Sequence, residues 1–139
     1  DGSDNFETRF LTADTCYFMK KTLVSAAILR FEGQVATWKG YKRSYPCYRC
    51  LFPDIPPPDT TPTCSQAGIF GALAGTVGTI QAMEFIKEIL EIGSLTGKLL
   101  LVDSLYTEVK KIKVNIDINC KLCSENPNIL NLDHHAKKK

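Results

Sequence analysis

Four of the six cysteines fall into two closely spaced pairs. Cys47 and Cys50 form one C-x-x-C pair, and Cys120 and Cys123 form the second, near the end of the chain. Each pair can bring two thiolates to one tetrahedral metal ion at metal–sulfur distances of about 2.3 Å. Four sulfur ligands fill the coordination shell and leave no position for a water molecule. The spacing therefore predicts a structural zinc site with no catalytic role of its own.

Two C-x-x-C pairs also occur in redox sites, in disulfides and as ligands of iron–sulfur clusters. The chain opens with the polar residues 1–5 and shows no signal-peptide pattern, which favours a reducing compartment. Pairs with this spacing usually bind metal there, and neither pair has a thioredoxin-like context. We therefore expect zinc, in a cytoplasmic protein.

The other two cysteines lie in different surroundings. Cys64 follows a proline-rich stretch at 53–62 and precedes a predicted helix, whose N-terminus favours a thiolate. Cys16 lies inside the first predicted helix, where we expect a buried core residue and not a reactive one. His134 and His135 are adjacent in a polar tail that we predict to be disordered, and we interpret them as bystanders.

Composition excludes several classes of protein. The 139 residues are 44% hydrophobic and 23% charged, which suits one globular domain with its own core. The formal charge of +2 includes three lysines at 137–139, so no basic face argues for nucleic acid. The longest apolar run, at 67–80, is broken by four glycines and is too short to span a bilayer.

The first half of the chain predicts a helix followed by two strands. Asp4 with Glu7 resembles an N-cap and its capping-box partner, and the helix is expected to run to about Lys21. Apolar stretches at 23–29 and 34–39 predict two strands that are close enough in the chain to be antiparallel neighbours.

The proline-rich stretch leads into a long predicted helix from Gln66 to Ile92, ended by Gly93. Glycines weaken a helix, so the small residues of its first half predict close approach of another backbone, within the sheet or across a dimer. Its second half is expected to be amphipathic, and its outward residues to be Glu84, Lys87, Glu88 and Glu91.

Two further strands are predicted at 98–105 and 108–118. In the second, apolar and polar residues alternate strictly, which is typical of a half-buried antiparallel strand. The whole predicts one α/β domain with a mixed sheet over residues 1–125, followed by the polar tail at 126–139.

The order of motifs resembles the C-terminal half of the ThiF/MoeB/HesA family, bacterial relatives of ubiquitin-activating enzymes. The resemblance covers nearly the whole chain to about Cys123. The segments that carry it are Asp4-Asn5 with Arg9, residues 23–27, 30–34 and 46–50, the stretch 62–68 around Cys64, and residues 78–84. It implies the C-terminal half of a Rossmann-like fold, with antiparallel strands, a long Gly-rich helix and a four-cysteine zinc knot.

The resemblance further implies an ATP-dependent adenylyltransferase. Such enzymes attach AMP to the C-terminal glycine carboxylate of a ubiquitin-like sulfur-carrier protein, which then accepts sulfur for thiamine, molybdopterin or a related product. The carboxylate attacks the α-phosphorus and pyrophosphate leaves, so Mg²⁺ and cationic groups stabilise the charge on the phosphoryl oxygens.

By position in the motifs, Asp4 matches the family's acidic Mg²⁺–ATP residue, with Asn5 and Arg9 beside the same site. From the residues alone, Asp4 is a helix cap and Arg9 an ordinary surface charge. Cys64 matches a cysteine that forms covalent sulfur-transfer links in several members and is dispensable in others. The resemblance also implies a homodimer, for which the Gly-rich helix face is the expected contact.

The sequence departs from the family in one respect. The family's phosphate loop is a Gly-rich turn between a strand and a helix, and these 139 residues contain no G-x-G-x-x-G. Two hypotheses follow. The chain is the C-terminal half of an adenylating enzyme, pairing with an N-terminal half, and is inactive alone; or it is a zinc-stabilised remnant that docks a partner protein without catalysis.

Overall fold

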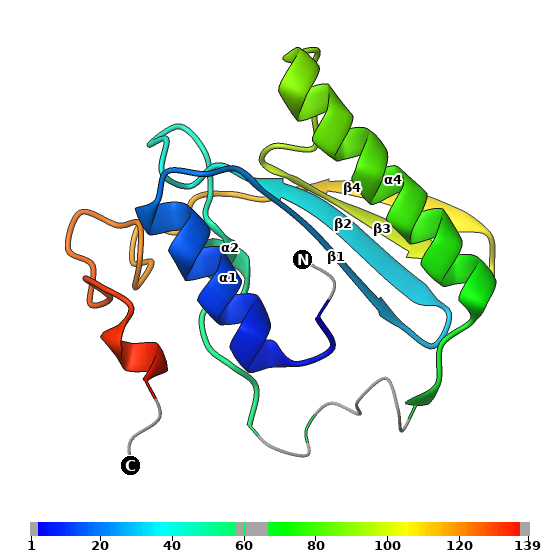
Figure 1. The fold of residues 1–139 in the computed structure, drawn as a ribbon, viewed down its shortest axis with the longest axis horizontal. Coiled ribbons are helices and arrows are strands. Elements are labelled where there is room, and N and C mark those ends of the chain that lie inside the picture. Colours follow the sequence, from blue (N-terminus) through cyan, green and yellow to red (C-terminus); the bar gives the residue numbers. More distant parts are fainter. Residues whose placement is uncertain (1–2, 58–59, 61–66, 137–139) are drawn as a thin grey trace.

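The computed structural model describes residues 3–57, 60 and 67–136. Its elements are three α-helices, four strands and a short 3-10 helix (Figure 1). In chain order they are α1 (Phe6–Phe18), β1 (Leu23–Leu29), β2 (Glu32–Trp38), α2 (Tyr48–Leu51), α4 (Gly71–Leu90), β3 (Lys98–Asp103), β4 (Glu108–Lys113) and η1 (Asp133–His135).

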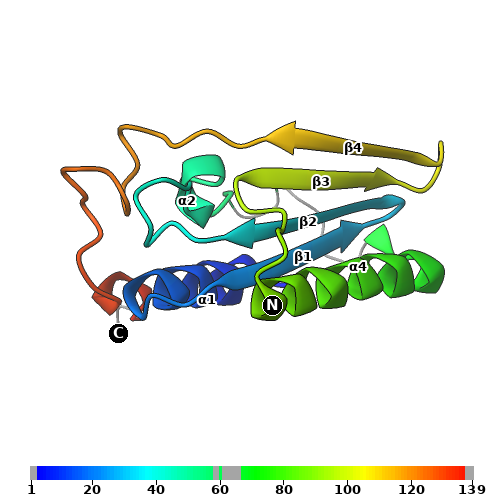
Figure 2. The same ribbon diagram turned by 90° about the horizontal axis from the view of Figure 1, so that it is seen from above.

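The four strands form one sheet in the order β1-β2-β3-β4, and each neighbouring pair is antiparallel. The strands lie between α1 on one side and α4 on the other (Figure 1). Viewed from above, β4 is the strand farthest from both helices (Figure 2). Successive side chains of a strand point to opposite faces, so each strand contributes to two separate cores.

The core on the α1 side is built around aromatic rings. Phe10 of α1 meets the Tyr48 ring edge-on at 5.3 Å between centroids, and Trp38 of β2 lies 5.5 Å from the same ring. Alternate strand residues face these rings, among them Leu23, Ala36 and Leu99. This core fixes α2, and with it the first cysteine pair, against the sheet.

The core on the α4 side is smaller. Leu73 and Val77 of α4 pack against Val35 and Val102. Gly33 makes this contact possible, because a Cβ at that position would lie 2.4 Å from a methyl group of Val77.

The predicted strand at 23–29 is confirmed, and so is its antiparallel pairing with the next strand. The predicted cap of α1 is wrong by one residue. Asn5 is the N-cap, since its side chain accepts a hydrogen bond of 2.8 Å from the Thr8 amide. The helix ends at Phe18, and Lys20 adopts a positive φ of 53°, which cannot continue an α-helix.

The long helix is confirmed in type but differs in detail. Gln66, its expected first residue, lies outside the described residues, and α4 runs from Gly71 to Leu90. A built Cβ would meet nothing within 4 Å at Gly71, Gly75 or Gly78, so these glycines do not serve a close approach within the sheet. The dimer alternative remains a prediction.

The predicted polarity of the second half of α4 is wrong for Glu84 and Glu88, although Glu91 is exposed as expected. Glu84 is buried, where it accepts a hydrogen bond of 2.7 Å from the Leu95 amide, and Glu88 pairs with Lys39 at 2.6 Å. The exposed side of the helix is apolar instead. We call Met83, Ile86, Ile89 and Leu90 the α4 apolar face; their exposed fractions are 55%, 46%, 66% and 59%.

The last strand is antiparallel as predicted, but it is shorter and not half-buried. All six residues of β4 are exposed, because it is the edge strand and no described element covers it. Only Val114, just beyond it, joins a core.

The tail expected from 126 onward is described as far as residue 136, and it folds back toward α1 through η1 (Figure 1). The boundary at 125 stays a prediction. No helix in the described part of the chain is long and apolar enough to cross a membrane.

Candidate functional site

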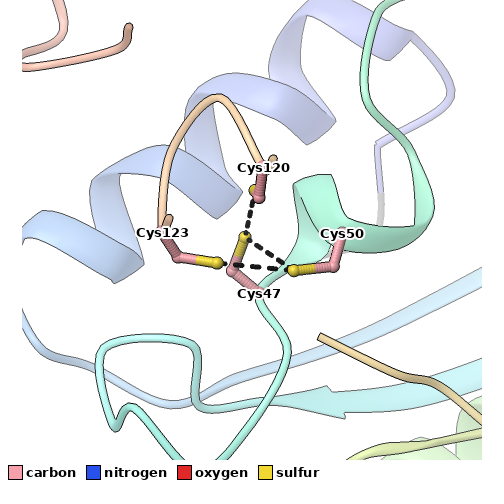
Figure 3. Close-up of side chains that lie close together, drawn as sticks. All are labelled: Cys47, Cys50, Cys120 and Cys123. Carbon is pink, nitrogen blue, oxygen red and sulfur yellow. Dashed lines mark hydrogen bonds between the residues drawn. The ribbon is translucent and has the colours of Figure 1, made fainter. Parts of the chain in front are cut away.

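The four paired cysteines converge on one point (Figure 3). Cys47 is the N-cap of α2 and Cys50 lies within that helix, while Cys120 and Cys123 lie in the loop after β4. The sulfur of Cys47 lies 3.8 Å from that of Cys50 and 3.5 Å from that of Cys120. The sulfurs of Cys50 and Cys123 are 3.4 Å apart.

These distances fit metal binding better than covalent pairing. A disulfide requires about 2.05 Å between sulfurs. A tetrahedral ion with metal–sulfur bonds of about 2.3 Å spaces its sulfurs about 3.8 Å apart. All four ligand atoms lie within 4.8 Å of one another, so the cluster could hold one metal ion.

The residues around the cluster bury two of its sulfurs and pack closely against them. Cys47 and Cys120 are each only 2% exposed. Gly40 lies so close that a Cβ there would come within 2.1 Å of the Cys47 Cβ. Hydrogen bonds from Cys123, Cys47 and Cys50 lower the pKa of the Cys120 thiol, which favours a thiolate at the centre.

Cys47 and Cys120 are buried, whereas Cys50 and Cys123 are partly exposed. Leu122 is buried beside the sulfurs, and Tyr17, Phe18 and Ile129 pack around them. Four thiolates in an apolar shell can hold a metal and cross-link two distant segments. The structure confirms that the two pairs meet in a cluster that could hold a metal ion, and its structural role stays a prediction.

The second predicted site lies at the start of α1. Asp4 and Asn5 are exposed, and Asn5 is engaged as the N-cap. Arg9 is half-buried and donates hydrogen bonds to the carbonyl oxygens of Ser3 at 2.6 Å and Ala26 at 3.0 Å. It therefore orders the segment before Asp4 against β1, which an ordinary surface charge does not do.

Arg9 also lines a shallow hollow on the α1 side of the sheet, together with Ser25, Gln34 and Trp38. The Trp38 indole donates a hydrogen bond of 2.8 Å to the Ser25 hydroxyl. The alternation of β1 and β2 could have placed these residues on one face, but no motif marked them as part of a site.

The other two cysteines, Cys16 and Cys64, are not part of the four-cysteine cluster. Cys64 lies outside the described residues. Cys16 packs against the core on the α1 side, and burial raises the pKa of its thiol, in agreement with an unreactive core residue.

A charged cluster that sequence reasoning missed lies between α1, α2 and η1. Asp14 is fully buried and accepts hydrogen bonds from Arg49 at 2.8 and 2.7 Å. The Nε2 atoms of His134 and His135 lie 2.9 and 2.7 Å from Asp14 Oδ2. The interpretation of these histidines as bystanders is wrong. A buried carboxylate needs hydrogen-bond partners, and here residues distant in the sequence provide them.

Comparison with known families identifies one match. The model of the ThiF family matches residues 1–122 of this chain. The curated relatives include a "Sulfur carrier protein adenylyltransferase" of Thermus thermophilus, 44% identical over 91% of this chain and 48% of the relative. A "SAMP-activating enzyme E1" of Haloferax volcanii is 44% identical over 90% of this chain and 46% of its own length.

An "Adenylyltransferase and sulfurtransferase MOCS3" of Culex quinquefasciatus is 42% identical over 95% of this chain and 30% of the relative. The chain thus spans less than half the length of these relatives. Among solved structures, Escherichia coli MccB with succinimide has a TM-score of 0.70 at 12% identity, over 90% of this chain and 38% of that one. At this identity the likeness concerns the fold alone.

Proposed function

Because the chain belongs to the ThiF family, we propose that it is the C-terminal portion of an ATP-dependent adenylyltransferase acting on a ubiquitin-like sulfur-carrier protein. The observation that carries the proposal is the 44% identity, over nine-tenths of the chain, to a relative named as a sulfur carrier protein adenylyltransferase. We assign residues 1–125 to this domain and place the protein in the cytoplasm.

The proposed reaction activates the C-terminal glycine of the carrier. A carboxylate oxygen of the glycine attacks the α-phosphorus of ATP, the bond between the α- and β-phosphates breaks, and pyrophosphate leaves. The product is an acyl adenylate that can accept sulfur. Negative charge spreads over the phosphoryl oxygens in the transition state, so preorganised cations and dipoles supply most of the acceleration.

Asp4 is the proposed magnesium–nucleotide residue of this half. Asp4 is exposed and lies one residue before Asn5, the N-cap of α1. Its carboxylate is therefore not used as the capping group of the helix. An exposed carboxylate suits Mg²⁺, which prefers a few carboxylate contacts together with phosphate and water ligands. Mg²⁺ would supply charge neutralisation of the phosphates.

Asn5 and Arg9 position Asp4 in this proposal. Asn5 fixes the first turn of α1 through its bond to the Thr8 amide. Arg9 holds the carbonyl of Ser3, next to Asp4, at 2.6 Å and ties it to β1. Their contacts hold the backbone on both sides of Asp4, which limits its freedom of movement.

We propose zinc as the metal of the four-cysteine cluster. An all-thiolate set with sulfur spacings of 3.4 to 3.8 Å suits tetrahedral zinc, and no described ligand position is left open for water. The ion would hold α2 to the segment that follows β4.

Cys64 remains the proposed covalent sulfur-transfer residue. It lies between the proline-rich stretch and α4, as the family resemblance places it. We keep this role separate from adenylation, since the transfer of AMP needs no thiol.

A second copy of the chain is the proposed partner of α4. The α4 apolar face exposes four large side chains on one helix, and the open glycines at 71, 75 and 78 extend along the same helix. Together they form a surface that another protein backbone can approach closely. The carrier protein is the other proposed partner.

ATP–pyrophosphate exchange tests the activity. We expect none from the 139-residue chain alone, and carrier-dependent exchange once a Gly-rich N-terminal half is present in the same polypeptide or as a subunit. In that complete enzyme, Asp4→Asn should lower exchange at least about 100-fold, while the distant, exposed Glu91→Gln should leave it unchanged. Carrier binding without exchange in the complete enzyme would favour the non-catalytic docking module instead.

A further inference from the structure

The four cysteines of the cluster differ in how far solvent reaches them. Cys50 and Cys123 are partly exposed, whereas Cys47 and Cys120 are each only 2% exposed. The two exposed cysteines come from different C-x-x-C pairs, and so do the two buried ones. A small reagent that arrives from solvent therefore meets one cysteine of α2 and one cysteine of the loop after β4.

The closest contacts between sulfurs follow the same division (Figure 3). The sulfurs of the exposed residues Cys50 and Cys123 lie 3.4 Å apart, and those of the buried residues Cys47 and Cys120 lie 3.5 Å apart. Within the α2 pair, the sulfurs of Cys47 and Cys50 are 3.8 Å apart. A disulfide requires about 2.05 Å between sulfurs, so a bond between the two pairs needs less movement than a bond within α2.

The buried half of the cluster is shielded by close packing. Leu122 is 1% exposed, and the rings of Tyr17 and Phe18 pack against the same group of residues. A Cβ at Gly40 would lie 2.1 Å from the Cβ of Cys47, so the backbone there leaves no space beside that residue. The exposed half is therefore the side from which the cluster can be attacked.

We propose that the cluster is a reversible switch for peroxides, in which oxidation of Cys50 and Cys123 to a disulfide releases the metal. The proposal rests on the zinc that we assign to the cluster and is independent of adenylation. Oxidation removes two of the four ligands. The remaining pair, Cys47 and Cys120, no longer provides the four-ligand set of a structural zinc site.

The chemistry needs only the thiolates and one peroxide molecule. Coordination to the metal keeps the sulfurs deprotonated. One exposed thiolate attacks a peroxide oxygen, the O–O bond breaks, and a sulfenic acid and hydroxide form. The other exposed thiolate attacks that sulfur, the S–O bond breaks, and a second hydroxide leaves. The two sulfurs lose two electrons, hydrogen peroxide gains both, and two protons from solvent complete two water molecules.

The product retains the connection that the metal made. Cys50 and Cys123 are 73 positions apart, so their disulfide joins α2 to the loop after β4. A disulfide within one C-x-x-C pair would join near neighbours and leave the two segments separate. Because a disulfide across a long loop restricts the unfolded chain strongly, the oxidised domain should keep part of the stability that it loses with zinc.

A bond between Cys16 and Cys47 is the competing product, since both residues line one small hollow beside the cluster. Burial raises the pKa of the Cys16 thiol, so little of it is present as the reactive thiolate. Cys47 itself is among the buried residues. We therefore expect this bond to form more slowly than the bond between Cys50 and Cys123.

A hydrogen peroxide titration of the reduced, zinc-loaded chain tests the switch. A colorimetric chelator follows zinc release, and free thiols are alkylated before tryptic digestion and mass spectrometry. Cleavage after Arg49 and Lys121 places the four cysteines of the cluster on separate peptides, and fragment ions distinguish Cys50 from Cys64. We expect the first disulfide to join Cys50 and Cys123, at least about fivefold more abundant than any other, with about one zinc released per disulfide.

Cys16→Ser is the matched control and should keep both the disulfide and the zinc release. The oxidised, zinc-free chain should melt at least about 5 °C above the reduced, zinc-free chain, and dithiothreitol with zinc should restore the starting form. A first disulfide within either C-x-x-C pair or between Cys16 and Cys47, or zinc retained in excess peroxide, would overturn the switch alone. A reduced chain without zinc would overturn the metal assignment as well.

Discussion

The sulfur of Cys47 lies 3.5 Å from that of Cys120, although 73 positions separate them in the chain. Cys47 starts α2, which packs on the sheet, whereas Cys120 belongs to a loop beyond the edge strand β4. Between them the hydrophobic contact is small, with Leu122 as the main buried side chain. The order of this loop therefore depends on the metal ion that we propose between the sulfurs.

Replacing one ligand should release the metal. We expect Cys120→Ser to lose about one zinc per chain and to lower the melting temperature by at least about 10 °C, since structural zinc contributes several kcal/mol and each kcal/mol is worth about 2–4 °C here. Metal analysis and thermal unfolding under reducing conditions measure both.

Cys16→Ser is the control for this change. Cys16 is half-buried and contributes nothing to the sulfur cluster, so the same substitution should keep the zinc. Full zinc content in Cys120→Ser, or equal loss in Cys16→Ser, would contradict the assignment of the ligands.

Acid should weaken the fold through Asp14. Its pKa is below the usual value in the folded chain, so its ionised form contributes stability above an unfolded pKa of about 3.9. That contribution is lost as pH falls through the lower, folded value. We expect the unfolding free energy to decline below about pH 4, and Asp14→Asn to flatten that decline; Glu91→Gln, at an exposed position, should leave it in place.

The partner of Asp14 should matter at neutral pH. Arg49→Met leaves the buried carboxylate without its bidentate donor, which typically costs about 3–5 kcal/mol. Urea unfolding measures the loss. A change under about 1 kcal/mol would mean that the two histidines can replace the guanidinium, contrary to the bonding described above.

Two glycines should respond to the same substitution with opposite signs. Gly33→Ala places a methyl group 2.4 Å from Val77 across the sheet–helix contact, and we expect a loss of about 1–3 kcal/mol. Gly75→Ala meets open space on α4 of the single chain, so in the monomer alanine should stabilise the helix by up to about 1 kcal/mol. Urea unfolding of both variants compares them, and equal effects would contradict the packing of α4 on β2.

Much of the architecture could be read from local patterns. The strand at Leu23–Leu29 has its bounds in the sequence, because an apolar run is bounded by charged residues, Lys21 before it and Arg30 after it. The cysteine cluster could be predicted from spacing, because the two sulfurs of one C-x-x-C pair lie close together whatever the fold. Only the contact between the two pairs depends on the tertiary structure.

Other features depend on tertiary context that no local pattern carries. Glu84 belongs to a charged stretch that resembles a solvent face, yet it is buried because the Leu95 amide needs an acceptor. The contact of His135 with Asp14 spans 121 positions. The apolar alternation after residue 108 predicts burial, but β4 is an edge strand whose cover, if any, comes from outside the described residues.

The α4 apolar face should control association. If a second copy covers it, then Ile89→Glu, at a side chain 66% exposed in the single chain, should change folding little but shift the molecular mass in sedimentation from dimer to monomer. Burying an unpaired carboxylate in an apolar interface costs several kcal/mol, which corresponds to at least a 100-fold weaker dimer. Lys98→Glu, exposed on β3, should leave the dimer intact. A monomeric parent chain at high concentration would contradict the homodimer, and an unchanged dimer in Ile89→Glu would place its interface elsewhere.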